Sequence, residues 1–142
     1  MKKIENEYTN SIFENIKHID ENGNEFWEAR ELQKVLEYKE WRKFLGVIDK
    51  AKRACDNSNI KVYDHFVEAD KMVEIGSGAK RKEVDYKLSR YACYLIVQNA
   101  DPRKRIIALG QTYFAIQTRK QEITEQEYDS LSNDEKRFYQ RR

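Results

Sequence analysis

The sequence has little of what marks a secreted, fibrous or membrane protein. It contains two cysteines, one proline and five glycines in 142 residues. A disulfide framework needs more cysteines, so we expect Cys55 and Cys93 to be reduced and buried. The first residues lack the apolar stretch of a signal peptide, and no apolar run approaches the roughly 18 to 20 residues that span a bilayer. We therefore expect a cytoplasmic domain that has no membrane partner.

Residues typical of catalytic and metal sites are also scarce. The two histidines, His18 and His65, are isolated, and the spacings of the cysteines match no zinc motif. No arrangement of a Ser, Cys or His nucleophile with a base is recognisable. The glycines of residues 76–82 do not fit the phosphate-binding pattern GxxxxGKS/T. We therefore expect no cofactor, no metal ion and no enzymatic activity.

One set of charged residues keeps a metal-dependent nuclease open as a remote alternative. Such enzymes place an acid and a lysine two residues apart on a strand, as Asp85 and Lys87 are here, with further carboxylates nearby in Asp70 and Glu83. The carboxylates would hold Mg²⁺ and the lysine would orient the attacking water. The pattern is so loose that a charged domain matches it by chance.

The small net charge of +2 hides an uneven distribution. Residues 1–40 carry 6 Lys and Arg against 10 Asp and Glu, and residues 121–142 carry 4 against 6. Residues 41–120 carry 17 against 9. A basic middle between acidic ends suits an electrostatic footprint for phosphates, and it predicts a nucleic-acid partner.

The first half of the chain predicts helices around one hairpin. Apolar residues at helical spacing indicate a short helix near residues 11–16, and Asn22-Gly23 predicts the tight turn of a hairpin over residues 19–27. Helices follow over residues 28–36 and about 40–55, separated by a break at Tyr38-Lys39, and such a pair can be a helix-turn-helix. The second helix has an apolar stripe of Trp41, Phe44, Leu45, Ile48 and Cys55. Opposite the stripe we place Arg42, Lys43, Lys50, Lys52 and Arg53.

The second half predicts a long hairpin followed by helices. Strands ending near residue 75 and covering residues 84–88 would flank a flexible basic loop at 76–82. Ser89 can cap a helix to about Asn99 that packs Tyr91, Tyr94 and Leu95, with Cys93 as a further candidate. Asp101-Pro102 predicts the start of a helix to about residue 122, burying Ile106, Leu109, Tyr113 and Ile116.

Arg103, Lys104 and Arg105 would then stand in the first turn of that last helix. The positive end of the helix dipole disfavours cations there, so an anionic partner is suggested. Capping boxes at Thr124 and Ser132 predict two further short helices. The chain as a whole therefore predicts an α+β domain. Tyr91, Tyr94, Tyr113 and Phe114 could stack on bases, but their helical spacing is more typical of a core.

Several strings resemble known proteins. Residues 26–32 (FWEAREL), followed by Leu36 and Tyr38, resemble the W-x-A-R-x-L-x-x-x-L-x-Y opening of the Bro-N domain found in phage antirepressors and baculovirus repeated-ORF proteins. Residues 88–95 (LSRYACYL) and 111–119 (QTYFAIQTR) resemble one branch of it, the bacterial DNA-damage-inducible protein D family.

The resemblance implies a compact α+β Bro-N fold, regarded as DNA-binding, in a protein induced by DNA damage. It also implies action on the recombinase filament that forms on single-stranded DNA. Members of the family continue past residue 142 with a largely helical segment. We therefore expect a Bro-N-like domain over residues 1–122 and the truncated start of a C-terminal helical segment over residues 123–142.

Together these observations predict a non-catalytic DNA-binding module of the bacterial DNA-damage (SOS) response, with single- or double-stranded DNA as its partner. The alternative is a protein-interaction module that modulates the recombinase filament. The oligomeric state is left open. The residues expected to contact phosphates are Arg42, Lys43, Lys50, Lys52, Arg53, Lys80, Arg81, Lys82, Arg90, Arg103, Lys104 and Arg105.

Overall fold

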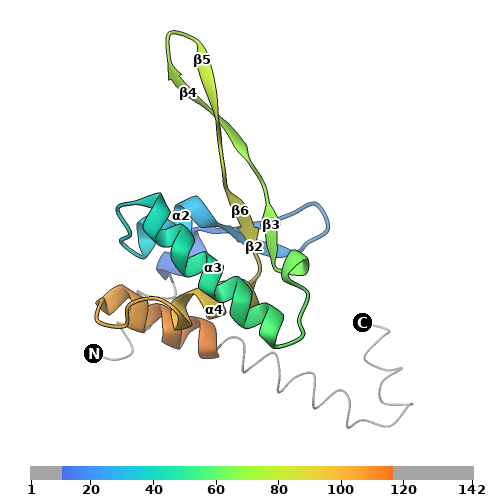
Figure 1. Cartoon of the computed structure of the whole chain (residues 1–142), viewed down its shortest axis with the longest axis vertical. Coiled ribbons are helices and arrows are strands. Elements are labelled where there is room, and N and C mark those ends of the chain that lie inside the picture. Colours follow the sequence, from blue (N-terminus) through green and yellow to red (C-terminus); the bar gives the residue numbers. More distant parts are fainter. Residues whose placement is uncertain (1–10, 117–142) are drawn as a thin grey trace.

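The computed structural model describes residues 11–116, which form helices and two antiparallel sheets (Figure 1). This confirms the α+β class. Helical residues 11–15 open the described part and helical residues 105–116 close it. Between them lie, in chain order, β1 (Lys17–Ile19), β2 (Glu25–Glu28), α2 (Ala29–Val35), α3 (Trp41–Asn57), a 3₁₀ turn (Val62–Asp64), β3 (Phe66–Glu68), β4 (Lys71–Gly76), β5 (Ala79–Glu83), β6 (Tyr86–Leu88) and α4 (Arg90–Gln98).

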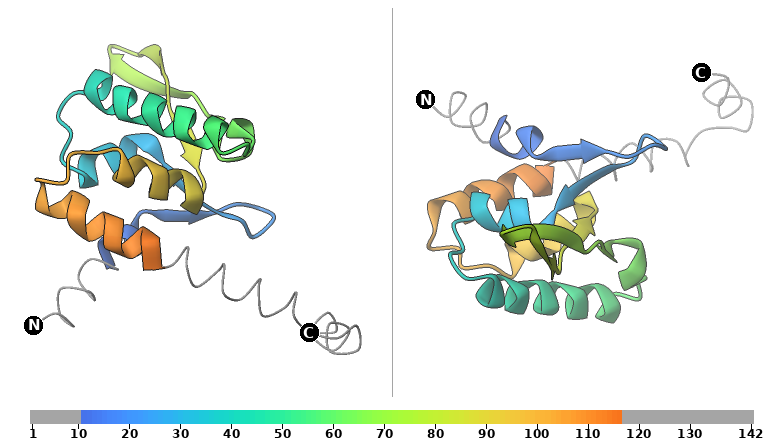
Figure 2. Two further views of the ribbon diagram at one scale, coloured as in Figure 1. Left: turned by 60° about the horizontal axis from the view of Figure 1, so that its bottom comes forward. Right: turned by 90° about the horizontal axis from the view of Figure 1, so that it is seen from above.

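The main sheet has four antiparallel strands in the order β1-β2-β6-β3. Its register places Trp27, Leu88 and Phe66 side by side across β2, β6 and β3, and all three are buried. Because side chains alternate between the faces of a strand, their neighbours Val67 and Lys87 lie on the other face, which is exposed. The helices therefore cover one face of this sheet, and α4 lies between α3 and helix 105–116 (Figure 2).

The core is centred on the indole of Trp27, which is fully buried. Its Nε1–H donates to the carbonyl oxygen of Phe13 at 2.9 Å, and its ring meets that of Phe114 edge-on with centroids 5.5 Å apart. A buried indole is favourable only when its N–H finds an acceptor, which the first helix supplies here. These contacts tie both ends of the described chain to the sheet.

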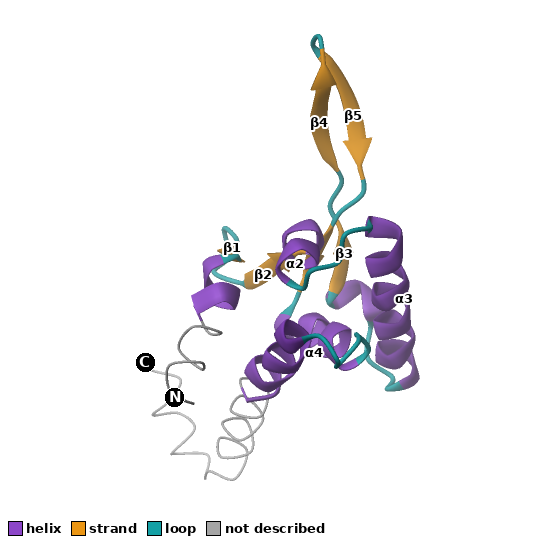
Figure 3. Ribbon diagram, turned by 90° about the vertical axis from the view of Figure 1, so that its left-hand side faces the viewer, coloured by secondary structure: helices purple, strands orange, loops and turns teal. Residues whose placement is uncertain are grey.

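The predicted long hairpin exists, but it is divided into two parts. β3 and β6 pair in the main sheet, whereas β4 and β5 pair with each other and stand clear of the domain (Figures 1 and 3). We call residues 71–83 the arm. The ladder is interrupted between the two parts at residues 69–70 and 84–85.

The prediction of a flexible basic loop at residues 76–82 is wrong. The turn is only Ser77-Gly78, and Lys80, Arg81 and Lys82 belong to β5, where they lie opposite Glu74, Val73 and Met72. Gly76, Ser77 and Gly78 all have positive φ angles, of 116°, 46° and 79°. Glycine adopts this backbone without steric cost, so the chain reverses within two residues and leaves the cations free to extend the strand.

The first hairpin is confirmed, with a longer turn than Asn22-Gly23 alone predicts. The carboxylate of Asp20 accepts hydrogen bonds from the backbone N–H groups of Asn22 and Asn24, both at 2.9 Å. Asp20 N–H also donates to the Asn24 carbonyl at 2.9 Å, which closes a three-residue loop, and Gly23 takes the left-handed position with φ 82°.

Helices α2 and α3 and the break between them are confirmed. Glu37 has a φ of 62°, its N–H donates to the Lys34 carbonyl at 3.1 Å, and the Tyr38 N–H donates to the Gln33 carbonyl at 3.0 Å. This is a Schellman ending, with glutamate where glycine is more usual. The expected N-cap of α4 is also confirmed, since Ser89 Oγ accepts from the Ala92 N–H at 3.0 Å.

Two predictions about the later helices are wrong in detail. The helix expected from Asp101-Pro102 is helical only from residue 105, because the Asp101 carboxylate accepts from the Arg103 N–H at 3.0 Å and holds a turn first. Its buried residues accordingly include Ile107, Tyr113 and Phe114, while Ile116 is exposed. In α4 the buried stripe is Ala92, Cys93, Ile96 and Val97, and Tyr91, Tyr94 and Leu95 are half-buried at its edge.

Gly110 lies where helix 105–116 approaches its neighbours most closely. A Cβ atom there would lie 3.1 Å from Phe13 Cζ and 3.2 Å from Val97 Cγ1, and both neighbours are fully buried. We predict that Gly110→Ala lowers the free energy of unfolding by about 1 kcal/mol or more, because overpacking outweighs the gain in helix propensity. Urea denaturation followed by circular dichroism measures this.

Gly46 is the matched control, because it lies within α3 with nothing within 4 Å of its added Cβ. Gly46→Ala should raise the free energy of unfolding by roughly 0.5 to 1 kcal/mol. If both substitutions stabilise the protein equally, the prediction that Gly110 is too closely packed to accept a Cβ atom is contradicted.

Cys55 and Cys93 are free and buried, as expected. Within residues 11–116 no helix is long and apolar enough to cross a bilayer. The capping boxes at Thr124 and Ser132 and the boundary at residue 122 lie outside the described residues, so they stay predictions.

Candidate nucleic-acid interface

The arm carries three consecutive cations, Lys80, Arg81 and Lys82, and all three are exposed. The Nζ of Lys82 lies 3.0 Å from the Asp70 carboxylate, and this hydrogen bond raises the pKa of Lys82. Within residues 11–116, Lys80 and Arg81 have no ion-pair partner, although Glu74 stands directly opposite Lys80 on β4. The arm therefore offers a concentrated positive charge to a partner.

The base of the arm is fixed by a buried carboxylate. Asp85 is only 1% exposed, and its Oδ1 accepts from the backbone N–H groups of Arg30 at 3.0 Å and Tyr86 at 2.8 Å. Its Oδ2 has no hydrogen-bond partner among the described residues but lies 3.4 Å from the Nζ of Lys71, which also contacts Glu28. Burial would lower the pKa of Lys71, but the hydrogen bond and charge of Glu28 outweigh it and raise that pKa, with Asp85 adding to the effect.

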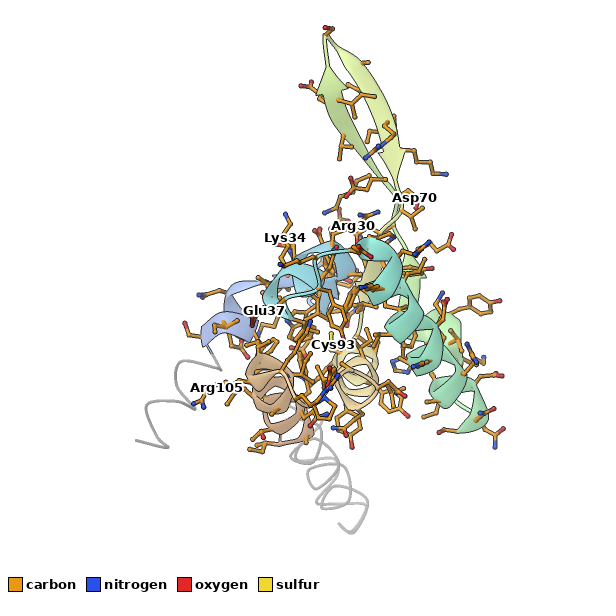
Figure 4. The ribbon with its side chains drawn as sticks, turned by 60° about the vertical axis from the view of Figure 1, so that its left-hand side comes forward. Arg30, Lys34, Glu37, Asp70, Cys93 and Arg105 are labelled. Carbon is orange, nitrogen blue, oxygen red and sulfur yellow. The ribbon has the colours of Figure 1, made fainter. Side chains whose placement is uncertain are left out.

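Arg30 connects the arm to the start of α3. Its Nε–H donates to the Val84 carbonyl at 2.9 Å and lies 3.2 Å from a Glu83 carboxylate oxygen. The same guanidinium lies over the ring of Trp41, 3.8 Å from its centroid. Figure 4 shows Arg30 at the foot of the arm. Sequence reasoning missed this role, because residues 30, 41 and 83 come together only in the folded chain.

Four of the five basic residues predicted on α3 are exposed, namely Arg42, Lys43, Lys50 and Arg53. Lys52 is the exception. It is half-buried, donates to the Tyr86 hydroxyl at 3.0 Å and lies 4.3 Å from the centroid of that ring. The reason is its position beside buried Ala51 and one turn after buried Ile48, at the edge of the apolar stripe. It therefore supports the fold of β6.

Arg90, another residue predicted to contact phosphates, is engaged within the domain. Its Nε and Nη2 form a bidentate pair with Glu25 at 2.7 and 2.8 Å, and its guanidinium lies 5.1 Å from the Trp27 ring. Burial opposes its charge, but the hydrogen bonds to Glu25 outweigh this and raise its pKa. Arg90 therefore stabilises the domain between β2 and α4.

The basic cluster at residues 103–105 is also differently placed. Arg103 and Lys104 precede the helix and do not stand in its first turn, so the argument from the helix dipole falls. The Nε and Nη2 groups of Arg103 donate to both oxygens of the Asp101 carboxylate at 2.9 to 3.2 Å. The Nζ of Lys104 donates to the Glu37 carbonyl at 2.9 Å. Arg105 is exposed, and Figure 4 shows it at the opposite end of the domain from the arm.

The pairing of Arg103 with Asp101 has a measurable consequence. The hydrogen bonds from the Arg103 side chain and backbone lower the pKa of Asp101 to about 2. We predict that Arg103→Ala moves this pKa back up toward the ordinary value near 3.9 for aspartate. Because the folded pKa is depressed, the pairing is intact above pH 4 and is lost as the pH falls through about 2. Carboxyl ¹³C NMR titration measures the pKa of Asp101. An unchanged pKa in the variant would show that Arg103 is not the cause of the low value.

The carboxylates that suggested a nuclease do not form a common site in residues 11–116. Asp70 pairs with Lys82, Glu83 with Arg30, and Asp85 is buried beside Lys71. Lys87 lies over the ring of Phe26, 5.0 Å from its centroid, on the open face of the sheet. Each acid thus already has a cation beside it.

A different group, His18, Glu28 and Glu31, brings three potential ligand atoms within 4.8 Å of one another. The hairpin register pairs His18 with Phe26, on the same face of β2 as Glu28, a placement that the isolation of His18 in the sequence could not indicate. Glu28 also contacts Lys71, which holds the pKa of Glu28 below its usual value although burial would raise it. The group therefore belongs to the ion pairs that hold the foot of the arm.

Residues 15–115 match the family described as BRO family, N-terminal domain, which is more than half of the chain. The chain belongs to the Bro-N family. This Bro-N chain is 56% identical over 130 residues to the DNA damage-inducible protein D of Escherichia coli (strain K12). The match covers 91% of this chain and 47% of that protein, so the Bro-N chain spans about half of its relative. No solved structure matches it.

Proposed function

We propose that this Bro-N domain is a non-catalytic DNA-binding module that regulates a response to DNA damage in the cytoplasm. The observation that carries the proposal is the arm, which projects from the domain and presents Lys80, Arg81 and Lys82 to solvent (Figure 1). Each lysine or arginine that neutralises a phosphate releases condensed counterions, which is the main source of non-specific affinity for DNA.

The exposed cations at the start of α3 extend this surface. Arg30 contacts both Glu83 at the end of the arm and Trp41 at the start of α3, so Arg42 and Lys43 lie near the foot of the arm. Lys50 and Arg53 follow further along the same helix, roughly 12 to 17 Å from Arg42 at 1.5 Å per residue. At these separations Lys50 and Arg53 would contact other phosphates of a DNA backbone than Arg42 does, with at least one phosphate between them.

The role in DNA damage is supported by the name of the E. coli relative, DNA damage-inducible protein D. The comparisons give no support for a recombinase filament as the partner, and that alternative stays a prediction. The action of the whole protein, of which this domain corresponds to about half in the relative, is part of the same proposal.

Fluorescence anisotropy with labelled duplex and single-stranded oligonucleotides tests the proposal. We expect binding at micromolar protein, with log K falling by roughly 0.7 to 0.9 per phosphate contact for each unit of log salt. Absence of salt-dependent binding to both forms of DNA would contradict it. A second experiment incubates supercoiled plasmid with the protein and Mg²⁺ or Mn²⁺. Cleavage of the plasmid would overturn the proposal that the domain is non-catalytic.

A further inference from the structure

The shape of the arm, together with its charge, indicates how DNA would be bound. We propose that the arm enters the major groove of double-stranded DNA tip first, an inference that rests on the proposed DNA-binding function. The arm is a two-stranded antiparallel ribbon that is joined to the domain only at its foot (Figure 3).

The thickness of the ribbon selects the groove. Packed β-sheets lie about 10 Å apart face to face, so one ribbon with side chains on both faces is about 10 Å thick. The major groove of B-DNA is about 12 Å wide and admits a two-stranded ribbon, whereas the minor groove is about 6 Å wide. The arm therefore fits the major groove without widening it.

The positions of the cations match the walls of that groove. Neighbouring residues on a strand point to opposite faces, so Lys80 and Arg81 project from opposite sides of the ribbon. The two walls of the groove are both lined by phosphates. The groove is about 8.5 Å deep and a strand rises about 3.4 Å per residue. With the turn at the groove floor, Lys80 and Arg81 therefore lie near its rim, beside phosphates of opposite strands.

The tip has the side chains that a close approach to base edges requires. Gly76, Ser77 and Gly78 add almost no bulk, and Ser77 supplies a hydroxyl that can donate to or accept from either kind of base edge. Ile75, which is 56% exposed, lies at the irregularity in the β4–β5 ladder just before the turn. An exposed apolar side chain at this depth suits contact with thymine methyl groups.

The foot of the arm limits the cost of binding. Asp85, Arg30 and Lys71 hold the base of the ribbon to the start of α2 through the contacts described above. A preorganised arm loses less conformational freedom on binding than a flexible loop would.

The test compares two duplexes of the same sequence, one unmodified and one in which cytosine is replaced by glucosylated 5-hydroxymethylcytosine, whose sugar fills the major groove. Anisotropy titration of the full chain should show at least about tenfold weaker binding to the modified duplex, because its groove no longer admits the ribbon. Netropsin, which occupies the minor groove, should change affinity for the unmodified duplex less than about twofold.

A variant with Lys80, Arg81 and Lys82 replaced by alanine shows whether the arm is the group in the groove. Its ratio of affinities for the two duplexes should fall toward one. A ratio that stays near tenfold would place another element, such as α3, in the groove and overturn the inference. Equal binding of the unaltered chain to both duplexes, or displacement by netropsin, would also overturn it while leaving DNA binding intact. If the unmodified duplex is not bound at all, the inference fails, and the proposed function fails with it only if single-stranded DNA is not bound either.

Discussion

Replacing Lys80, Arg81 and Lys82 together with alanine is expected to weaken duplex DNA binding by about 100-fold at roughly 0.1 M salt. Each lost phosphate contact removes about 0.9 from the slope of log K against log salt, so the slope should decrease by roughly 2 to 3. The three side chains are exposed and Lys82 forms a single surface ion pair with Asp70, so the fold should be little affected. Anisotropy titrations at several salt concentrations measure both quantities.

Two matched variants separate the arm from net charge and from misfolding. Replacing the exposed Lys61, Arg103 and Arg105 with alanine removes the same charge away from the arm and the start of α3, and should weaken binding far less. Glu74→Gln removes the acid opposite Lys80 and should tighten binding several-fold, a gain that unfolding cannot produce. Equal losses for the two triple variants would mean that binding depends on total charge and that the arm has no special part.

Asp85→Ala is expected to lower the free energy of unfolding by about 2 to 4 kcal/mol. The substitution leaves the N–H groups of Arg30 and Tyr86 without their acceptor and removes the negative charge beside Lys71. A buried donor that loses its acceptor costs about 1 to 3 kcal/mol. Urea denaturation should show a lower midpoint with an unchanged slope, as for a loss of stability without a change in compactness.

Two variants, Asp85→Asn and Asp70→Ala, are the controls for Asp85→Ala. Asn keeps an oxygen acceptor for the two N–H groups, so its cost should be smaller than that of Ala, and the difference isolates the hydrogen bonds. Asp70 forms one surface ion pair with Lys82, so Asp70→Ala should cost no more than about 1 kcal/mol. If Asp85→Ala were as mild as Asp70→Ala, the buried carboxylate would not be what fixes the arm.

Elements whose signals are local could be predicted from the sequence. The apolar period of α3, the cap at Ser89 and the left-handed glycine of the first hairpin all act within a few residues. The sequence predicts a loop at residues 76–82 because β5 is exposed along most of its length and so lacks the alternation that burial of one face imposes. Alternation in β4 indicated a strand, but it could not show that this strand would leave the main sheet.

The candidate site was predictable only in part, because charge in a sequence does not reveal its partners. The cations of the arm and most of those on α3 are exposed as expected. Arg90 is half-buried against Glu25, which is 65 residues away in the sequence, and Lys104 donates to the backbone of Glu37, 67 residues away. The hydrogen bond from the Arg30 N–H to the Asp85 carboxylate joins residues that are 55 apart in the sequence. Periodicity in a sequence cannot detect a contact at that separation.

The central claim is that DNA is bound by the arm and the adjacent start of α3. Titration of the ¹⁵N-labelled chain with a short duplex, followed by amide chemical shifts, tests it most directly. The largest changes should fall in residues 71–83 and around Arg42 and Lys43, with little change in residues 105–116. Changes concentrated on the open face of the sheet around Lys87 or on residues 105–116, with the arm unaffected, would contradict the claim.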